Sequence, residues 1–228
     1  MSIAVIIAAA GSGARLGGMK PKQFQLLGGR PVLAHTLEAF NRLDIIEEII
    51  IAAPSEYIAH TWDIAARYGF NKVREIVPGG KNRAESVYAA LKQLAANIVL
   101  IHDGARPFVS EELIKSIAQA AKHYGAAVVG IPLTDTIKEV NQQSQAVKTP
   151  DRQRFWCVQT PQGFTYEIIS KAYAQGDKDG ILESATDDSI LVERIGATIQ
   201  MVEGHPSNIK ITTREDLLMG EIMLRSRA

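Results

Sequence analysis

The chain has 228 residues, of which 46% are hydrophobic, and its 25 basic and 25 acidic residues give a formal net charge of zero. This length and apolar content suffice for one large core, so we expect a single domain over residues 1–228. Without excess positive charge, a nucleic-acid partner is not expected. No stretch approaches the roughly 18 apolar residues of a membrane span, and the first apolar run is too short for a signal peptide. We therefore expect a cytoplasmic protein without a membrane partner.

The first apolar run, residues 3–10, leads into glycines that are followed by cations. Gly11 and Gly13 come directly after the run, and no acidic residue occurs before Glu38. The cations in this segment are Arg15, Lys20, Lys22 and Arg30. Glycines let the backbone approach a phosphate, and the cations offset its charge. The pattern predicts a triphosphate site with Ala9 and Ala10 at its base; the alternative is an ordinary surface loop with exposed Lys and Arg.

Two better-known phosphate motifs do not fit this loop. The dinucleotide fingerprint G-x-G-x-x-G requires a sixth glycine, where this chain has Leu16, and an acid after the second strand, where it has Ala52, Ala53 and Pro54. The P-loop requires a lysine where Met19 stands. A dehydrogenase is therefore disfavoured.

Strand-like and helix-like segments alternate after this loop. Apolar or β-prone runs at residues 3–9, 49–53, 73–77, 97–101 and 126–132 are separated by amphipathic segments at 31–43, 55–68, 83–94 and 110–124. Such alternation predicts the α/β class, with a doubly wound, mostly parallel Rossmann-like sheet. Ser110 is expected to cap the helix that follows it.

Chemistry-bearing residues follow two of these strands, where ligands of such sheets bind. A glycine turn at residues 78–86 can present backbone amides to a base, with Gly80 and the Ser86 hydroxyl as contacts, although a plain turn is the alternative. After the next strand, Asp103 precedes Gly104 and Arg106. We expect Asp103 to hold Mg²⁺ near phosphates, and a structural ion pair between Asp103 and Arg106 is the alternative.

The alternation breaks at residues 135–153, which are polar and lie between two β-prone pieces. They predict a projecting β-arm at about residues 135–157. Such an arm cannot bury a core alone, so it lies on its own body or on a second subunit; we expect a homodimer through the arm. The aromatic and apolar neighbours of the single cysteine, Cys157, favour a packed thiol.

Two helix starts are expected in the last third of the chain. Thr186 is a candidate N-cap, and Thr212 with Glu215 has capping-box spacing. Between them, Lys210 sits among apolar residues in a strand-like run, which is unusual for a solvated lysine.

Short segments along nearly the whole chain resemble one family, the 2-C-methyl-D-erythritol 4-phosphate cytidylyltransferases, within the pyrophosphorylase-like nucleotidyltransferases. They are AAAGSGARL, PKQ, GGKNRAESV, HDGARP, PLTDTIK, TPDR, TPQGF, TDD and NIKIT, in that order. The resemblance implies a fold of the nucleotide-diphospho-sugar transferase type. It also implies a Mg²⁺-dependent reaction of CTP with a polyol phosphate in non-mevalonate isoprenoid biosynthesis, giving a CDP-alcohol and pyrophosphate.

The resemblance also implies residue roles. Arg15 and Lys22 match residues that stabilise the α-phosphate transition state, and Arg152 and Lys210 match those that orient the sugar phosphate. Further matches are Arg106, Thr136 and Thr186 for substrate contacts, Asp103 for the metal-linked acid, and Ala9, Ala10, Gly11, Gly13, Gly80, Ser86, Asp103 and Gly104 for the nucleotide. Two alternatives stay open at this point, a ribitol 5-phosphate cytidylyltransferase and a non-catalytic nucleotide-binding regulator.

Overall fold

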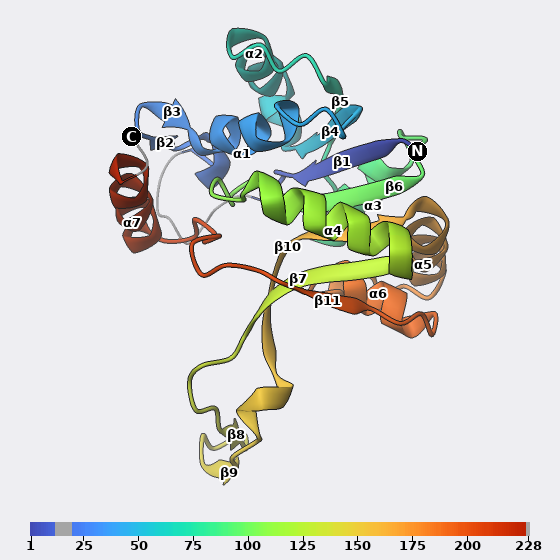
Figure 1. The fold of residues 1–228 in the computed structure, drawn as a ribbon, viewed down its shortest axis with the longest axis vertical. Coiled ribbons are helices and arrows are strands. Elements are labelled where there is room, and N and C mark those ends of the chain that lie inside the picture. Colours follow the sequence, from blue (N-terminus) through green and yellow to red (C-terminus); the bar gives the residue numbers. More distant parts are fainter. Residues whose placement is uncertain (12–19, 227–228) are drawn as a thin grey trace.

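The computed structural model describes residues 1–11 and 20–226, and its centre is a mostly parallel seven-stranded sheet (Figure 1). The strand order is β11-β7-β10-β6-β1-β4-β5. These strands are β1 (Ile3–Ala8), β4 (Glu48–Ala53), β5 (Val73–Pro78), β6 (Ile98–Asp103), β7 (Ala126–Pro132), β10 (Trp156–Thr165) and β11 (Gln200–Glu203). Only β10 runs antiparallel to its neighbours β6 and β7. The predicted α/β class and doubly wound sheet are confirmed.

Helices cover both faces of the sheet, which explains why its central strands are apolar throughout. Val5 and Ile7 of β1 pack toward α1 (Val32–Asn41), α2 (Ile58–Arg67) and α4 (Glu111–Tyr124). Ala4 and Ile6 pack toward α3 (Arg83–Leu91), α5 (Tyr166–Lys178) and α6 (Ser189–Arg194). Successive strand residues point to opposite faces, so a strand covered on both sides must be apolar at every position.

A third, smaller apolar cluster attaches the C-terminal helix α7 (Arg214–Arg225). It joins Leu27, Val32, Phe108 and Ile211, with Leu217 and Leu224 of α7 packed against them. Leu27 belongs to the short hairpin of β2 (Leu26–Leu27) and β3 (Arg30–Pro31), which follows the single-turn helix η2 (Lys22–Phe24). The chain thus brings residues 22–31 beside its own C-terminal segment.

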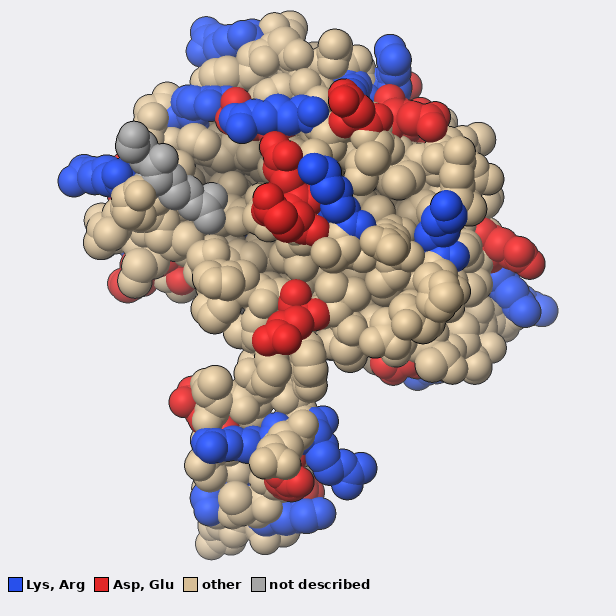
Figure 2. All heavy atoms as spheres, viewed as in Figure 1, with Lys and Arg blue, Asp and Glu red and all other residues tan. Residues whose placement is uncertain are grey.

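The predicted arm projects from the body as a long extension of β7 and β10 (Figure 1). At its tip, β8 (Glu139–Val140) pairs with β9 (Ala146–Lys148), and the single-turn helix η4 (Arg152–Arg154) begins the return. The space-filling view shows a narrow neck between arm and body, with Lys, Arg, Asp and Glu mixed over the arm surface (Figure 2). Within one chain the arm stands apart from the body.

Several local predictions are wrong. Cys157 is exposed rather than packed, because it lies on the part of β10 that pairs with β7 alone, opposite Ile131 and beyond the pairing with β6. Helix α5 (Tyr166–Lys178) was not predicted from the sequence. Two single-turn helices, η3 (Ser55–Tyr57) and η5 (Leu182–Ser184), complete the elements of the described residues.

Helix caps were placed correctly in one case and one to two residues early in the others. Ser110 caps α4, where its hydroxyl accepts a hydrogen bond from the Leu113 amide. The capping box of α7 joins Thr213 and Asp216 instead of Thr212 and Glu215, because Thr213 is still extended and the helix begins after it. Near α6, Asp187 rather than Thr186 accepts the hydrogen bond of a first-turn amide, from Ile190.

None of the helices in the described part of the chain is long and apolar enough to cross a membrane. On the face drawn in Figure 2, basic and acidic side chains are interspersed over the body. That face carries no broad basic patch of the kind that tracks a nucleic-acid backbone.

Candidate active site

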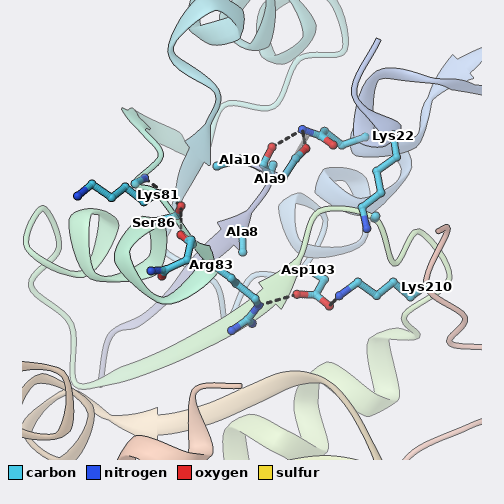
Figure 3. Close-up of a pocket in the computed structure, with 14 residues that line it drawn as sticks. Ala8, Ala9, Ala10, Lys22, Lys81, Arg83, Ser86, Asp103 and Lys210 are labelled. Atoms are coloured by element: carbon cyan, nitrogen blue, oxygen red, sulfur yellow. Dashed lines mark hydrogen bonds and ion pairs between the residues drawn. The ribbon is translucent and has the colours of Figure 1, made fainter. Parts of the chain in front are cut away.

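A cavity of about 410 Å³ opens at the carboxyl ends of β1, β5 and β6 (Figure 3). Its lining joins the end of β1 to the glycine turn after β5, to Lys22 and to the end of β6. The lining residues are Ala8, Ala9, Ala10, Gly11, Lys22, Gln23, Gly80, Lys81, Asn82, Arg83, Ser86, Asp103, Ala105 and Lys210. The predicted position of the ligand site, at this edge of the sheet, therefore coincides with a real cavity.

The glycine turn after β5 packs closely on β1. A Cβ atom on Gly79 would lie 2.2 Å from the Cβ of Ala10, and one on Gly80 would lie 2.4 Å from the Cβ of Glu85. Only glycine lets the turn approach this closely. Ser86 is buried, accepts a hydrogen bond from the Gly80 amide at 3.0 Å and donates one to the Asn82 carbonyl at 2.7 Å. Its hydroxyl therefore shapes the turn.

The buried Gln23 side chain secures the other wall of the cavity. Its amide nitrogen donates to the carbonyl oxygens of Ala9 and Gly11. Gln23 thus holds the backbone that follows β1, as far as Gly11. Gly104 reinforces the same edge, because its amide donates to the Ala8 carbonyl.

Asp103, at the end of β6, is surrounded by cations (Figure 3). Its Oδ1 accepts a hydrogen bond from Arg83 Nε at 3.0 Å, and its Oδ2 lies 2.7 Å from Lys210 Nζ and 3.6 Å from Arg106 Nε. Burial alone would raise the pKa of Asp103, but Arg83, Lys210 and Arg106 hold it well below its usual range. The structural ion pair with Arg106 is thus present, as one of three.

His102 supports this cluster from the core. It is buried beside Phe40, and its ring nitrogens contact the Arg106 carbonyl and the Thr160 hydroxyl. Burial lowers the pKa of His102 to about 4. A neutral imidazole with both nitrogens engaged is a hydrogen-bonding element of the fold.

The donor set at Asp103 fits a magnesium ion only in one binding mode. Among residues 1–11 and 20–226, no three His, Cys, Asp or Glu side chains gather into a metal-binding group. Mg²⁺ commonly takes one or two carboxylates and completes its shell with water and substrate phosphates. Asp103 is a single carboxylate whose oxygens already pair with Arg83, Arg106 and Lys210, so in the described part it suits only that mode, in which water and substrate phosphates supply most of the ligands.

An adjoining cavity of about 430 Å³ shares Arg83, Asp103 and Lys210 with the first. Its lining includes Arg106 and Thr186, two of the predicted substrate contacts. The structure therefore brings most of the predicted nucleotide and substrate residues of the body to two cavities that share Asp103 in their walls.

Five of the predicted site residues do not line these cavities. One of them, Gly104, follows Asp103, and its amide is bonded to the Ala8 carbonyl behind the cavity wall. Gly13 and Arg15 lie outside the described residues. Thr136 and Arg152 lie on the arm, away from the body in a single chain (Figure 1), and the Arg152 guanidinium donates to the Thr134 carbonyl at 2.6 Å. Their predicted roles stay predictions.

Arg83 and Gln23 also line the cavity, although no pattern in the sequence predicted either of them. Both lie inside matching segments, GGKNRAESV and PKQ, but neither has a spacing that indicates phosphate or metal chemistry. For Arg83 the informative fact is its pairing with Asp103, 20 positions away, and no local pattern reveals such a pair.

Comparisons with known proteins agree with this geometry. The family model described as 2-C-methyl-D-erythritol 4-phosphate cytidylyltransferase matches residues 3–226. A relative of that name from Clostridium acetobutylicum is 45% identical over 225 residues, covering 98% of this chain and 97% of its own.

Solved structures give the same result. The structure of 4-diphosphocytidyl-2C-methyl-D-erythritol synthase from Anaerococcus prevotii aligns with a TM-score of 0.84 at 34% identity, covering 98% of each chain. A 2-C-methyl-D-erythritol 4-phosphate cytidylyltransferase from Thermus thermophilus aligns with a TM-score of 0.82 at 34% identity, over 99% of this chain and 100% of that one. The chain therefore belongs to the 2-C-methyl-D-erythritol 4-phosphate cytidylyltransferase family of nucleotidyltransferase enzymes.

Proposed function

We propose that the protein transfers CMP from CTP to 2-C-methyl-D-erythritol 4-phosphate, giving 4-diphosphocytidyl-2-C-methyl-D-erythritol and pyrophosphate in non-mevalonate isoprenoid biosynthesis. The observation that carries the proposal is the convergence of Lys22, Lys210, Asp103 and the 79–86 turn on one cavity, in a chain that matches the family over residues 3–226. The cavity of about 410 Å³ is within the size range of small-molecule sites.

In this reaction the substrate phosphate is already an anionic nucleophile. Its oxygen forms a bond to the α-phosphorus of CTP, the bond from that phosphorus to the bridging oxygen breaks, and the electron pair leaves with pyrophosphate. No general base is needed, so the protein has to position two polyanions and offset their repulsion. Lys22 and Lys210 line the space where they would meet, and we assign Arg15 to the same role.

The base is assigned to the turn after β5. The residues that we assign to the nucleotide are Ala9, Ala10, Gly11, Gly13, Gly80, Ser86, Asp103 and Gly104. The Lys81 amide is already bonded to the Glu85 carboxylate at 2.9 Å, so the turn is rigid before the nucleotide arrives. Because the Gly80 and Lys81 amides are bonded within the turn, we assign the reading of the pyrimidine edge to its fixed carbonyl oxygens, which can accept from an amino group.

Asp103 is assigned as the protein ligand of a Mg²⁺ ion that enters with the triphosphate. The ion would supply positive charge at the phosphates as their charge redistributes. Within the protein, Asp103 keeps Arg83, Arg106 and Lys210 together beside the phosphates.

The arm is assigned to a homodimer in which each arm reaches the partner's cavity. Val140, Val147 and Phe155 on the arm are 44 to 63% exposed in one chain, and Arg152 cannot act on a phosphate held near Lys22 from where it lies. A two-fold dimer that exchanges arms buries such surface and completes both sites with Thr136 and Arg152.

The deciding experiment is a pyrophosphate-release assay with CTP, UTP, ATP and GTP, each against 2-C-methyl-D-erythritol 4-phosphate and ribitol 5-phosphate. We expect release with CTP and the methylerythritol substrate to exceed every other combination. Equal rates with UTP would refute the assignment of the turn to the base. Faster release with ribitol 5-phosphate would identify the protein as a ribitol 5-phosphate cytidylyltransferase. No release with any pair would favour a non-catalytic nucleotide-binding regulator.

A further inference from the structure

Asp188, immediately before α6, is a carboxylate with 0% exposure that performs no helix capping. Its Oδ1 accepts a hydrogen bond from the Tyr173 hydroxyl at 2.5 Å, and its Oδ2 forms an ion pair with Arg83 Nη2 at 2.8 Å. A fully buried carboxylate is strongly unfavourable unless it is paired and hydrogen-bonded. Tyr173 therefore holds Oδ1, while Oδ2 faces Arg83 in an ion pair without hydrogen-bond geometry.

Arg83 is held from two sides. While Nη2 faces Asp188, Nε donates to Asp103 Oδ1 at 3.0 Å, on the wall of the candidate active site. Arg83 is the first residue of α3, and a cation at a helix N-terminus is unfavourable because that end carries a partial positive charge. Burial would lower the pKa of Arg83, but Asp188 and Asp103 raise it above its ordinary value. Two carboxylates therefore keep the cation at this position.

Because the guanidinium of Arg83 is shared between Asp188 and Asp103, it bonds to only one oxygen of Asp103. Arginine prefers to bind one carboxylate with two parallel hydrogen bonds. Without Asp188, nothing else among the described partners of Arg83 would hold Nη2, and both ends of the fork could turn to Asp103. That turn would take Oδ2 from Lys210, which lies 2.7 Å away.

We propose that Asp188, braced by Tyr173, is a positioning residue that limits Arg83 to one oxygen of Asp103 and leaves the other oxygen to Lys210. This inference rests on the proposed cytidylyl transfer for its kinetic consequence. The chain of contacts leads from Tyr173 in the core to Asp188, then to Arg83, and from Arg83 to Asp103 at the carboxyl edge of the sheet. The Tyr173 ring is stacked on Tyr88, with ring centroids 5.5 Å apart. Packing therefore fixes the hydroxyl that bonds to Asp188.

The test compares Asp188→Asn, Tyr173→Phe and the control Tyr88→Phe. The control removes the hydroxyl of the tyrosine stacked on Tyr173, whereas the groups that hold Asp188 are the Tyr173 hydroxyl and Arg83. Asp188→Asn is expected to lower kcat by about 10- to 100-fold with little change in the KM for CTP, because misplaced charges weaken the transition state more than nucleotide binding. Tyr173→Phe should lower kcat by a few-fold, and Tyr88→Phe should leave it unchanged.

A double-mutant cycle separates positioning from a general structural effect. If Asp188 acts through Arg83, Asp188→Asn adds no further loss of kcat to an Arg83→Gln protein, and it stabilises that protein by removing an unpaired buried charge. The same fold loss in both backgrounds overturns the proposal, as does an unchanged kcat in Asp188→Asn alone.

A measurement without turnover keeps the inference independent of the proposed function. The ¹⁵N–¹H resonance of Arg83 Nε, assigned with Arg83→Lys, should shift in Asp188→Asn and Tyr173→Phe but not in Tyr88→Phe. An unshifted resonance in Asp188→Asn overturns the proposal. If the wild-type protein releases no pyrophosphate with any substrate pair, the proposed function fails and the resonance alone decides whether Asp188 positions Arg83.

Discussion

The carboxyl edge of the sheet and the arm differ in how far a single chain buries their side chains. At the edge, Asp103 is 6% exposed and is paired with three cations from three segments of the chain. On the arm, Val147 and Val140 are 63% and 55% exposed. They lie on the two short strands β9 and β8, which pair with each other. The edge is buried among side chains from distant segments, whereas the arm contacts named above lie within the arm itself. Substitutions at the edge therefore test chemistry, and substitutions on the arm test assembly.

The largest effect is expected at the edge, for Lys22→Ala. Removing one preorganised cation from the transition state typically lowers kcat by about 100-fold or more. Pyrophosphate release measures the loss, and circular dichroism checks that the fold is kept. Lys171→Ala, an exposed lysine on α5, is the control and should change kcat by less than about twofold. A Lys22→Ala protein with near-normal turnover would contradict the assigned site.

Mixing the Lys22→Ala and Arg152→Ala proteins tests whether the arm of one subunit completes the cavity of the other. Each variant alone should be nearly inactive. After subunit exchange, half of the dimers are mixed, and each of these has one site with both residues intact, so about a quarter of wild-type activity should return. Native mass spectrometry confirms that mixed dimers form. If they form and activity stays at the level of the separate variants, each arm serves its own chain.

An apolar substitution at the arm tip tests assembly without touching the cavity. Val147→Ser should raise the dimer dissociation constant by about 30-fold if Val147 is a central contact, as measured by analytical ultracentrifugation. Leu218→Ser on α7 is the matched control, because Leu218 is 66% exposed but lies on the body. Equal dissociation constants for the two variants would show that the arm tip is not the interface.

The smallest effect is expected where the body needs no partner, at the cap of α7. Thr213→Ala removes one side of the capping box and should lower the free energy of unfolding by about 1 kcal/mol. That corresponds to a drop in Tm of about 2–4 °C for a domain of this size, measured by calorimetry. Thr198→Ala, at an exposed loop position, should leave Tm in place. A loss in dimer affinity for Thr213→Ala would mean that α7 takes part in assembly.

Local patterns accounted for much of the fold and for the edge of the sheet where the cavity lies. The alternation of apolar runs and amphipathic segments predicted the strands of the parallel core, since a strand covered on both faces is apolar at every position. The glycines after β1 and β5 marked the edge where the cavity lies. Helix starts were less accurate, because neighbouring Thr, Asp and Glu residues compete for the same amides, and the backbone at Thr213 decided between them.

The sequence by itself determined which residue types stand at the strand ends, because backbone and side-chain periodicity are local properties. Only the tertiary structure decided which of them meet. Arg83, Asp188 and Lys210 reach Asp103 or its partner from α3, from the start of α6 and from the segment before α7. The tertiary structure also left Cys157 and the arm uncovered. Charge pairing over such separations depends on the strand order, which brings β6 between β1 and β10, and no interaction between near neighbours in the sequence encodes that order.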